Sequence, residues 1–325
     1  MAAASGGGSL RVLMTAHESP MRYAAGRIRR HLHWARTQGL RRLLEEDDLD
    51  PIRRASRKVA KWRWRRAHGS APGTARAVLL VGLQRSGTNM VVRGLERAPE
   101  FEVYNENHSA AFDRFRLRPV GHIRGLLEAS RHPYVLLKPL CDSHRTPELL
   151  EALRTRSEPR ALWVYRSAEG RARSAVAKFG DQNLRVLREL AQGRGRDRWQ
   201  AQGLSSDSLE LIGRLDWSSV DAVSAAALFW YVRNRLYFEL GLEGRPDVLL
   251  VSYDAMVADP AAEMRRICGF LDFPYHPRLV AGITARPPAI TPTVALQPQI
   301  AACCAALGAE LEAARREQAA TPTVP

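Results

Sequence analysis

Short apolar runs recur through the middle of the chain, and each is followed by a polar or glycine-containing turn and then by an amphipathic segment. The apolar runs predict strands at residues 77–83, 101–104, 133–137, 160–165 and 247–251. The segments between and after them predict helices at residues 90–97, 121–130, from 146 onward, 168–179 and 260–271, and a long helical stretch from 182 to 233 and onward that includes 219–240. Strands that alternate with helices form a parallel sheet covered on both faces. The pattern therefore predicts an α/β fold, a three-layer sandwich with a central, mostly parallel sheet.

The two ends of the chain depart from this pattern. Residues 1–18 are rich in small residues and are expected to be disordered, and residues 19–70 predict a basic helical extension. The Gly- and Pro-containing stretch before residue 75 is typical of a linker. The main domain is therefore expected at residues 75–285. The remaining tail, 286–325, predicts one more helix at residues 299–318.

Length and composition fit a globular protein with a sizeable core. The chain has 325 residues, 45% of them hydrophobic, and no run approaches the roughly 20 apolar residues of a membrane span. The first residues lack the charged start and long apolar core of a signal peptide. The four cysteines, Cys141, Cys268, Cys303 and Cys304, have no metal-site spacing. These features favour a reducing cytoplasm.

Positive charge is concentrated near the N-terminus. The net charge is +15, and residues 1–70 carry 16 Lys and Arg against 6 Asp and Glu. Trp62 and Trp64 lie among these cations. Such a composition suits an anionic membrane surface or nucleic acid. We expect a peripheral membrane contact through residues 19–68 and no specific nucleic acid partner; the alternative is a solvated helix that packs on the main domain through its tryptophans.

The strongest chemical signal is the turn after the first predicted strand. Gly82 and Gly87 have the spacing of a P-loop, which suggests a fold like that of the P-loop nucleoside triphosphatases, but Thr88 stands where that motif has its lysine. Asn89 replaces the hydroxyl that normally holds magnesium. A cation, Arg85, lies inside the loop instead. The loop therefore predicts an anion site that works without a metal.

Further candidate residues follow other predicted strands, where open α/β sheets bind ligands. Lys138 comes directly after the third strand, and Arg166 ends the fourth. Ser174 lies eight residues after Arg166, about two turns into the next predicted helix. A guanidinium and a hydroxyl in these positions are able to hydrogen-bond the same phosphate group.

Together these motifs resemble the sulfotransferases that use 3′-phosphoadenosine-5′-phosphosulfate (PAPS). The loop Arg85–Asn89 reads R-S-G-T-N, where the family has R/K-S-G-T followed by Thr, Ser or Asn. Arg166 and Ser174 match the family's arginine and serine eight residues apart. Residues 253–260, Y-D-A-M-V-A-D-P, and 270–274, F-L-D-F-P, match its late pattern. The resemblance covers about residues 77–275 and implies transfer of a sulfuryl group.

The resemblance also implies roles for these residues. Arg85 and Lys138 would contact the sulfuryl and bridging oxygens. The 5′-phosphate would lie against the rest of the loop, Ser86, Gly87, Thr88 and Asn89. Arg166 and Ser174 would bind the 3′-phosphate, so that PAPS is chosen over ATP. Transfer would proceed by in-line displacement without a metal and leave adenosine 3′,5′-bisphosphate.

The general base has more than one candidate. Glu106 follows the second predicted strand, and members with a glutamate in that region favour it. Some members carry K-T-H after the third strand, where this chain has Lys138-Pro139-Leu140 and then His144 as its nearest histidine. His108 is a further rival, and Asp142 is a candidate for orienting the base.

Two other functions remain open on the sequence. One is a P-loop kinase of a small molecule, and the other is a non-catalytic protein that binds membrane or nucleic acid on a degenerate P-loop scaffold. For the sulfotransferase, the acceptor is expected to be a small molecule, glycan or lipid. A peptide tyrosine is a further possibility, because the predicted acceptor segments, 104–132 and 180–218, carry no readable code.

Overall fold

The computed structural model describes residues 51–285 and 295–320. The predicted disordered start (1–18), most of the basic extension (19–50) and parts of the tail (286–294 and 321–325) lie outside the described residues. The chain divides into two compact units, Met1–Lys58 and Val59–Pro325. The second unit contains the sheet and every candidate site residue.

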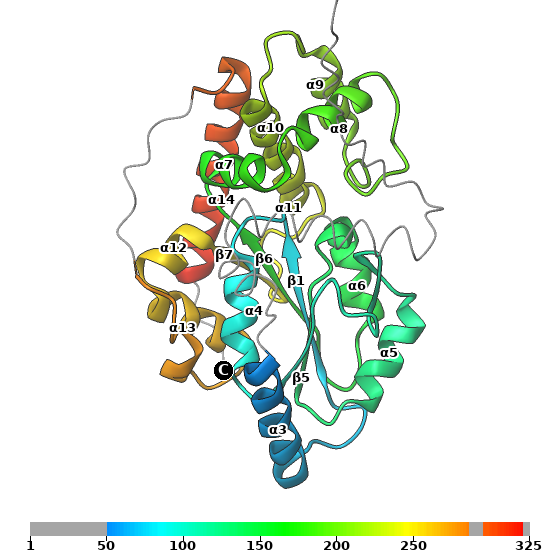
Figure 1. Cartoon of the computed structure of the whole chain (residues 1–325), viewed down its shortest axis with the longest axis vertical. Coiled ribbons are helices and arrows are strands. Elements are labelled where there is room, and N and C mark those ends of the chain that lie inside the picture. The colour runs from blue at the N-terminus through cyan, green and yellow to red at the C-terminus, as the bar shows by residue number, and fades with distance from the viewer. Residues whose placement is uncertain (1–50, 286–294, 321–325) are drawn as a thin grey trace, which may run out of the picture. The chain divides into compact units, whose positions relative to one another are not determined.

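A five-stranded sheet forms the centre of the second unit (Figure 1). In spatial order its strands are β2 (Phe101–Tyr104), β5 (Tyr134–Leu137), β1 (Arg76–Gly82), β6 (Arg160–Tyr165) and β7 (Val248–Ser252). Every neighbouring pair is parallel. After β1, the next strands of the sheet in the chain, β2 and β5, lie on one side of it, and the last two, β6 and β7, lie on the other side. The carboxyl end of β1 is therefore the point where the strand order reverses, which is the usual ligand position in such sheets.

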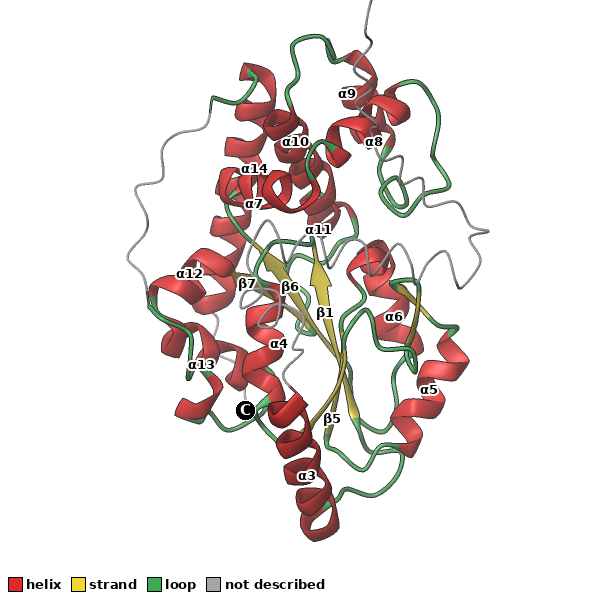
Figure 2. Cartoon of the chain, in the orientation of Figure 1, coloured by secondary structure: helices red, strands yellow, loops and turns green. Residues whose placement is uncertain are grey.

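Helices cover both faces of the sheet, which confirms the predicted three-layer α/β sandwich (Figures 1 and 2). Successive side chains of β1 point to opposite faces, so Leu79 and Val81 join one core, and Val78 and Leu80 join the other. The second face is covered by α4 (Thr88–Glu96), α12 (Tyr253–Ala258) and α13 (Pro260–Phe270). The first face is covered by α5 (Val120–Ala129), α6 (Thr146–Ala152), α7 (Ala168–Phe179), α10 (Ala222–Asn234), α11 (Leu236–Glu239) and α14 (Pro298–Ala320).

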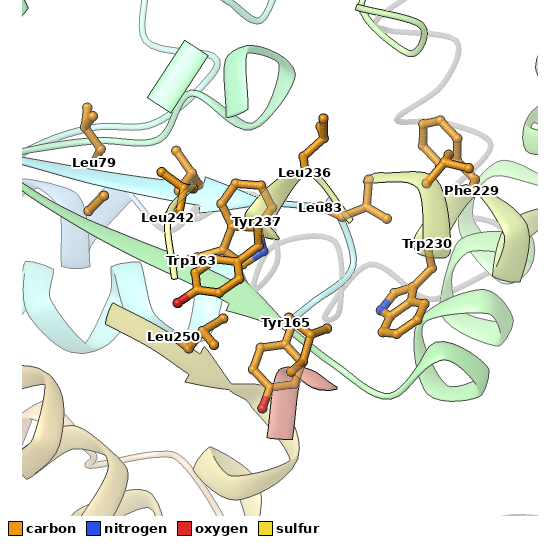
Figure 3. Close-up of a cluster of buried hydrophobic side chains, with 14 of the residues drawn as sticks. Leu79, Leu83, Trp163, Tyr165, Phe229, Trp230, Leu236, Tyr237, Leu242 and Leu250 are labelled. Carbon is orange, nitrogen blue, oxygen red and sulfur yellow. The ribbon is translucent and has the colours of Figure 1, made fainter. Parts of the chain in front are cut away.

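Aromatic side chains fill the core between β6 and the helices of the first face (Figure 3). Trp163 of β6 is fully buried and donates its indole N–H to Oδ1 of Asn234 at 3.3 Å. Trp230 of α10 and Tyr237 of α11 are also buried. These two aromatics belong to the core.

The prediction of one continuous helix after residue 182 is wrong. The structure breaks it into α8 (Gln182–Ala191), α9 (Ser206–Arg214), α10 and α11. Gly193 and Gly195 follow α8 with φ of 73° and 70°, a left-handed conformation that does not continue a helix. Asp221 then starts α10, because its carboxylate accepts the backbone N–H of Ser224.

Some short elements were not predicted. A small hairpin is made by β3 (Phe112–Asp113) and β4 (Arg116–Leu117), and a 3₁₀ turn, η1 (Leu140–Arg145), follows β5. The described end of the basic extension forms a helix, as predicted: α3 (Pro51–His68). None of the described helices combines the length and apolarity needed to cross a bilayer.

Candidate functional site

The loop after β1 is shaped by two glycines. Gly82 has a φ of 114°, and a Cβ there would lie 2.3 Å from the carbonyl oxygen of Val164 on β6. Gly87 has a φ of 90° and precedes the first residue of α4. Arg85 between them also has a positive φ, 72°. A non-glycine residue in this region is uncommon and marks a tightly constrained loop.

The loop has the features of an anion site. It leads directly into α4, whose first N–H groups and positive dipole end point out of the helix toward the loop. The hydroxyl of Ser86 is fully buried and has no hydrogen-bond partner among the described residues. Buried polar atoms are normally paired, so this hydroxyl fits a group that arrives with a ligand.

The loop and the second motif meet directly. Nε of Arg85 donates to the hydroxyl of Ser174 on α7 at 3.0 Å. The two residues lie 89 positions apart in the chain. The loop arginine and the motif serine therefore share one small region.

A second polar contact joins the loop to β5. Nζ of Lys138 donates to Oδ1 of Asn89 at 2.6 Å and lies 3.3 Å from Oε1 of Glu106. The side chain of Lys138 is only 5% exposed, whereas that of Glu106 is 23% exposed. The lysine is thus held from two sides, and the carboxylate retains access to solvent.

Tyr253, the first residue of α12, connects the loop with Arg166. A Cβ at Gly87 would lie 2.2 Å from Cδ2 of Tyr253. The guanidinium carbon of Arg166 lies 4.3 Å from the centre of the same ring, a cation–π contact. Nε of Arg166 is buried and has no hydrogen-bond partner among the described residues. Arg166 is therefore positioned by an aromatic ring, with its Nε left unpaired.

The strand ends that carry these residues are fixed by hydrogen bonds. The indole N–H of Trp230 donates to the carbonyl of Arg166 at 2.8 Å, and the Ser167 N–H donates to the Asp254 carboxylate at 2.7 Å. The hydroxyl of Ser143 accepts the N–H of Gly82 and donates to its carbonyl, both at 3.0 Å. The loop and Arg166 are therefore held in place by neighbouring elements.

A buried arginine lies behind the loop. Arg171 of α7 is 1% exposed, and it donates to the carbonyls of Gln84 at 3.2 Å and Ala226 at 2.9 Å and to Oδ1 of Asn183 at 3.3 Å. Burial, and next the charge of Arg85, lower the pKa of Arg171 to about 9. It is still a cation at neutral pH, so it adds positive potential at the loop and fixes the carbonyl of Gln84.

His144 lies outside this network. Burial, and next the charges of Arg233, Arg116 and Arg145, lower its pKa to about 4. Asp142 is tied into the fold, because it accepts the Leu117 N–H at 2.8 Å and pairs with Arg116 at 2.7 Å.

The other candidate histidine, His108, makes a local hydrogen bond. His108 is exposed, and its Nδ1 accepts the N–H of Ala110 at 3.3 Å. Among the described residues, no group of three His, Cys, Asp or Glu side chains is placed to hold a metal ion.

The structure thus brings together most of the residues that the sequence singled out. Contacts among the loop, Lys138, Glu106, Ser174 and Arg166 form one region at the carboxyl edge of the sheet. Sequence reasoning missed the bridging position of Tyr253 and the support from Arg171. Tyr253 directly follows an apolar strand, a position that would have justified placing it at the site. No pattern in the sequence marks Arg171 as buried.

Comparisons with known proteins give the family of the chain. The chain matches the family model of the sulfotransferase domain over residues 75–285, and it therefore belongs to the sulfotransferase family. A comparison with curated protein sequences finds no match. Among solved structures, it is similar to a sulfotransferase from Alicyclobacillus acidocaldarius at 16% identity, covering 76% of this chain and 96% of the other, with a TM-score of 0.43. The sulfotransferase domain of the Synechococcus PCC 7002 olefin synthase matches at 14% identity, covering 74% of this chain and 96% of that domain, with a TM-score of 0.38.

The contact between Gly87 and Tyr253 gives the first prediction. Replacing Gly87 with Ala places a methyl group against the ring, which has to move and take Arg166 with it. We expect the variant to fold and to bind adenosine 3′,5′-bisphosphate at least about tenfold more weakly, as measured by calorimetry. The free energy of unfolding should also fall by roughly 1–2 kcal/mol because of the left-handed backbone.

Gly73 supplies the matched control. It has a similar φ of 76°, but a Cβ there would meet no atom within 4 Å. The Gly73→Ala variant should therefore show the backbone cost with unchanged affinity for the bisphosphate. Equal affinities of the two variants would contradict a role for the Tyr253 contact.

The environment of His144 gives a prediction about pH. Its pKa in the folded state, about 4, lies below the usual 6.5, so the unfolded chain takes up a proton first as the pH falls. We expect this residue to lower the free energy of unfolding progressively from about pH 6.5 to pH 4. Denaturant unfolding of the wild type and of His144→Gln at several pH values measures this, and the variant should show a flatter dependence. Identical pH dependence of the two proteins would contradict the shift.

Proposed function

We propose that the protein transfers a sulfuryl group from PAPS to a hydroxyl or amine of an acceptor. One observation carries the proposal. The loop after β1 and Arg166 after β6 are joined through one tyrosine ring, and the loop arginine bonds Ser174. A nucleotide with a phosphate at each end needs two anion sites at a fixed separation, and this chain of contacts supplies them.

Unpaired groups at the loop and at Arg166 support PAPS as the donor. The buried hydroxyl of Ser86 and the backbone at the start of α4 are available to the 5′-phosphate. Nε of Arg166 is available to the 3′-phosphate, which ATP lacks. Arg85, assigned to the sulfuryl end of PAPS, hydrogen-bonds Ser174, assigned to the 3′-phosphate. A bound anion would accept hydrogen bonds from both side chains.

Cations near the loop favour the transfer itself. When bound, PAPS supplies a sulfuryl group whose leaving oxygen gains negative charge during in-line displacement. Arg85 and Lys138 stabilise that charge, since preorganised donors at a developing anion lower the barrier by several kcal/mol. Asn89 and Glu106 hold the ammonium group of Lys138 in place. Because protein cations carry this role, the proposed reaction does not need a divalent ion.

Glu106 is the general base in this proposal. Its carboxylate lies 3.3 Å from Lys138 and retains solvent access, so an acceptor hydroxyl can reach it. The acceptor oxygen loses its proton to Glu106, forms the new bond to sulfur, and the bond from sulfur to the phosphate oxygen breaks. His144 is a poorer base, because its protonation is opposed by burial and by three arginines. The acceptor we expect is a small molecule, a glycan or a lipid.

The donor assignment is tested by calorimetry with adenosine 3′,5′-bisphosphate. We expect the bisphosphate to bind equally well with and without EDTA. Arg166→Ala should weaken binding roughly 10- to 100-fold, the usual range for a lost hydrogen bond to a charged group. The matched control is Arg185→Ala, an exposed arginine on α8 that pairs with Asp181.

The competing functions give different results in the same experiment. Tighter binding of ATP that depends on magnesium would identify a small-molecule kinase. Binding of neither nucleotide by a folded protein would favour the non-catalytic scaffold.

The base assignment is tested with Glu106→Gln. This change keeps the size of the side chain and removes its basicity. We expect transfer from labelled PAPS, assayed with a screened acceptor, to slow by about a hundredfold or more, with near-normal binding of the bisphosphate. A variant with full activity would show that another group takes the proton.

A further inference from the structure

The second half of α3 has one side that packs on the main domain. The ring of Trp64 stacks on that of His132, with centroids 5.8 Å apart and an interplanar angle of 6°. After the helix, the Ser70 N–H donates to the carbonyl of Arg131 at 3.0 Å, and Nε of Arg131 donates to the carbonyl of Ser70 at 2.8 Å. These contacts hold Trp64 against the main domain. One of the two tryptophans therefore packs as the alternative expectation from the sequence describes.

The other tryptophan lies on a different side. Val59 and Trp62 are 54% and 48% exposed, and they are the exposed large hydrophobic side chains among the described residues. Arg63 and Arg66 are exposed as well. Positions 59, 62, 63 and 66 have the i, i+3, i+4, i+7 spacing of one helix face. We call these four residues the Trp62 face.

The Trp62 face combines apolar groups with cations. The guanidinium carbon of Arg66 lies 5.0 Å from the centre of the Trp62 ring. The sequence from Pro51 to His68 contains no acidic residue, so the formal charge of this segment is of one sign. An apolar centre on a helix of one charge is typical of a helix that lies in a membrane interface.

We propose that the Trp62 face binds the surface of an anionic lipid bilayer. Val59 and the indole of Trp62 enter the boundary between headgroups and acyl chains. Arg63 and Arg66 contact lipid phosphate and carboxylate groups, each worth about a fivefold gain in partitioning. This proposal does not depend on the sulfuryl transfer.

Nucleic acid fits the same face less well. Base recognition on an aromatic platform needs a free ring face, and Arg66 already covers the Trp62 ring. The aliphatic side chain of Val59 gains from lipid contact and offers a base no stacking surface. The apolar content of the face therefore favours lipid as the partner.

The Trp62 face is separate from the donor site. Its helix is anchored at His132, which precedes the amino end of β5, whereas Lys138 follows the carboxyl end of the same strand. Substitutions on the face should therefore leave binding of adenosine 3′,5′-bisphosphate unchanged.

The test is co-sedimentation of the full chain with vesicles of phosphatidylcholine alone and with added phosphatidylserine. We expect binding to the anionic vesicles only, and weaker binding as salt is raised. Trp62→Ala should reduce partitioning about tenfold, and Trp62→Phe should restore much of it. The double change Arg63→Glu/Arg66→Glu should reduce it by more than about twentyfold.

Arg214→Glu is the matched charge control, because Arg214 is an exposed arginine on α9. It should bind vesicles nearly as well as the wild type, and all variants should bind the bisphosphate normally. The proposal is overturned if the wild type does not sediment with anionic vesicles or if the Trp62 face variants bind as well as the wild type. It is also overturned if the variants lose binding to single-stranded RNA while the wild type ignores vesicles.

Discussion

The close approach of Tyr253 to Gly87 is the constraint on which the donor side of the site depends. A side chain of any size at position 87 would collide with the ring, and the ring in turn positions the guanidinium of Arg166. The three residues follow three different strands of one parallel sheet. Parallel strands present their carboxyl ends at one edge, and the missing Cβ lets the three ends close to contact distance.

Positive charge is concentrated at this edge at some cost to the fold. Arg171 is buried without a carboxylate among its hydrogen-bond partners, and burial together with Arg85 disfavours its charged form. Backbone carbonyls and one amide oxygen offset part of that cost. An anion bound by the loop would relieve the repulsion between the two arginines. The same arrangement that disfavours the empty site therefore favours a bound phosphate or sulfate.

Much of the fold and part of the site could be predicted from the sequence, because both depend on local patterns. Apolar runs located all five strands of the sheet to within one residue at every end, and the glycine spacing located the loop. The broken helical region after residue 182 was missed, since the breaks depend on single residues such as Gly193 and Ser205. The bridging by Tyr253 was missed for another reason. Its position after a strand indicates the edge of the sheet at which it lies, but its contacts with Gly87 and Arg166 join segments more than 80 residues apart, and no local pattern encodes such contacts.

The position of α3 relative to β5 bears on how the two proposed activities combine. Trp64 anchors the helix before the amino end of the strand, and Lys138 lies after its carboxyl end. A four-residue strand spans about 13 Å, so the anchor of α3 and the donor site lie at opposite ends of the same strand. Substitutions on the Trp62 face therefore act far from Glu106, and a loss of vesicle binding with unchanged binding of adenosine 3′,5′-bisphosphate would separate the two proposed activities.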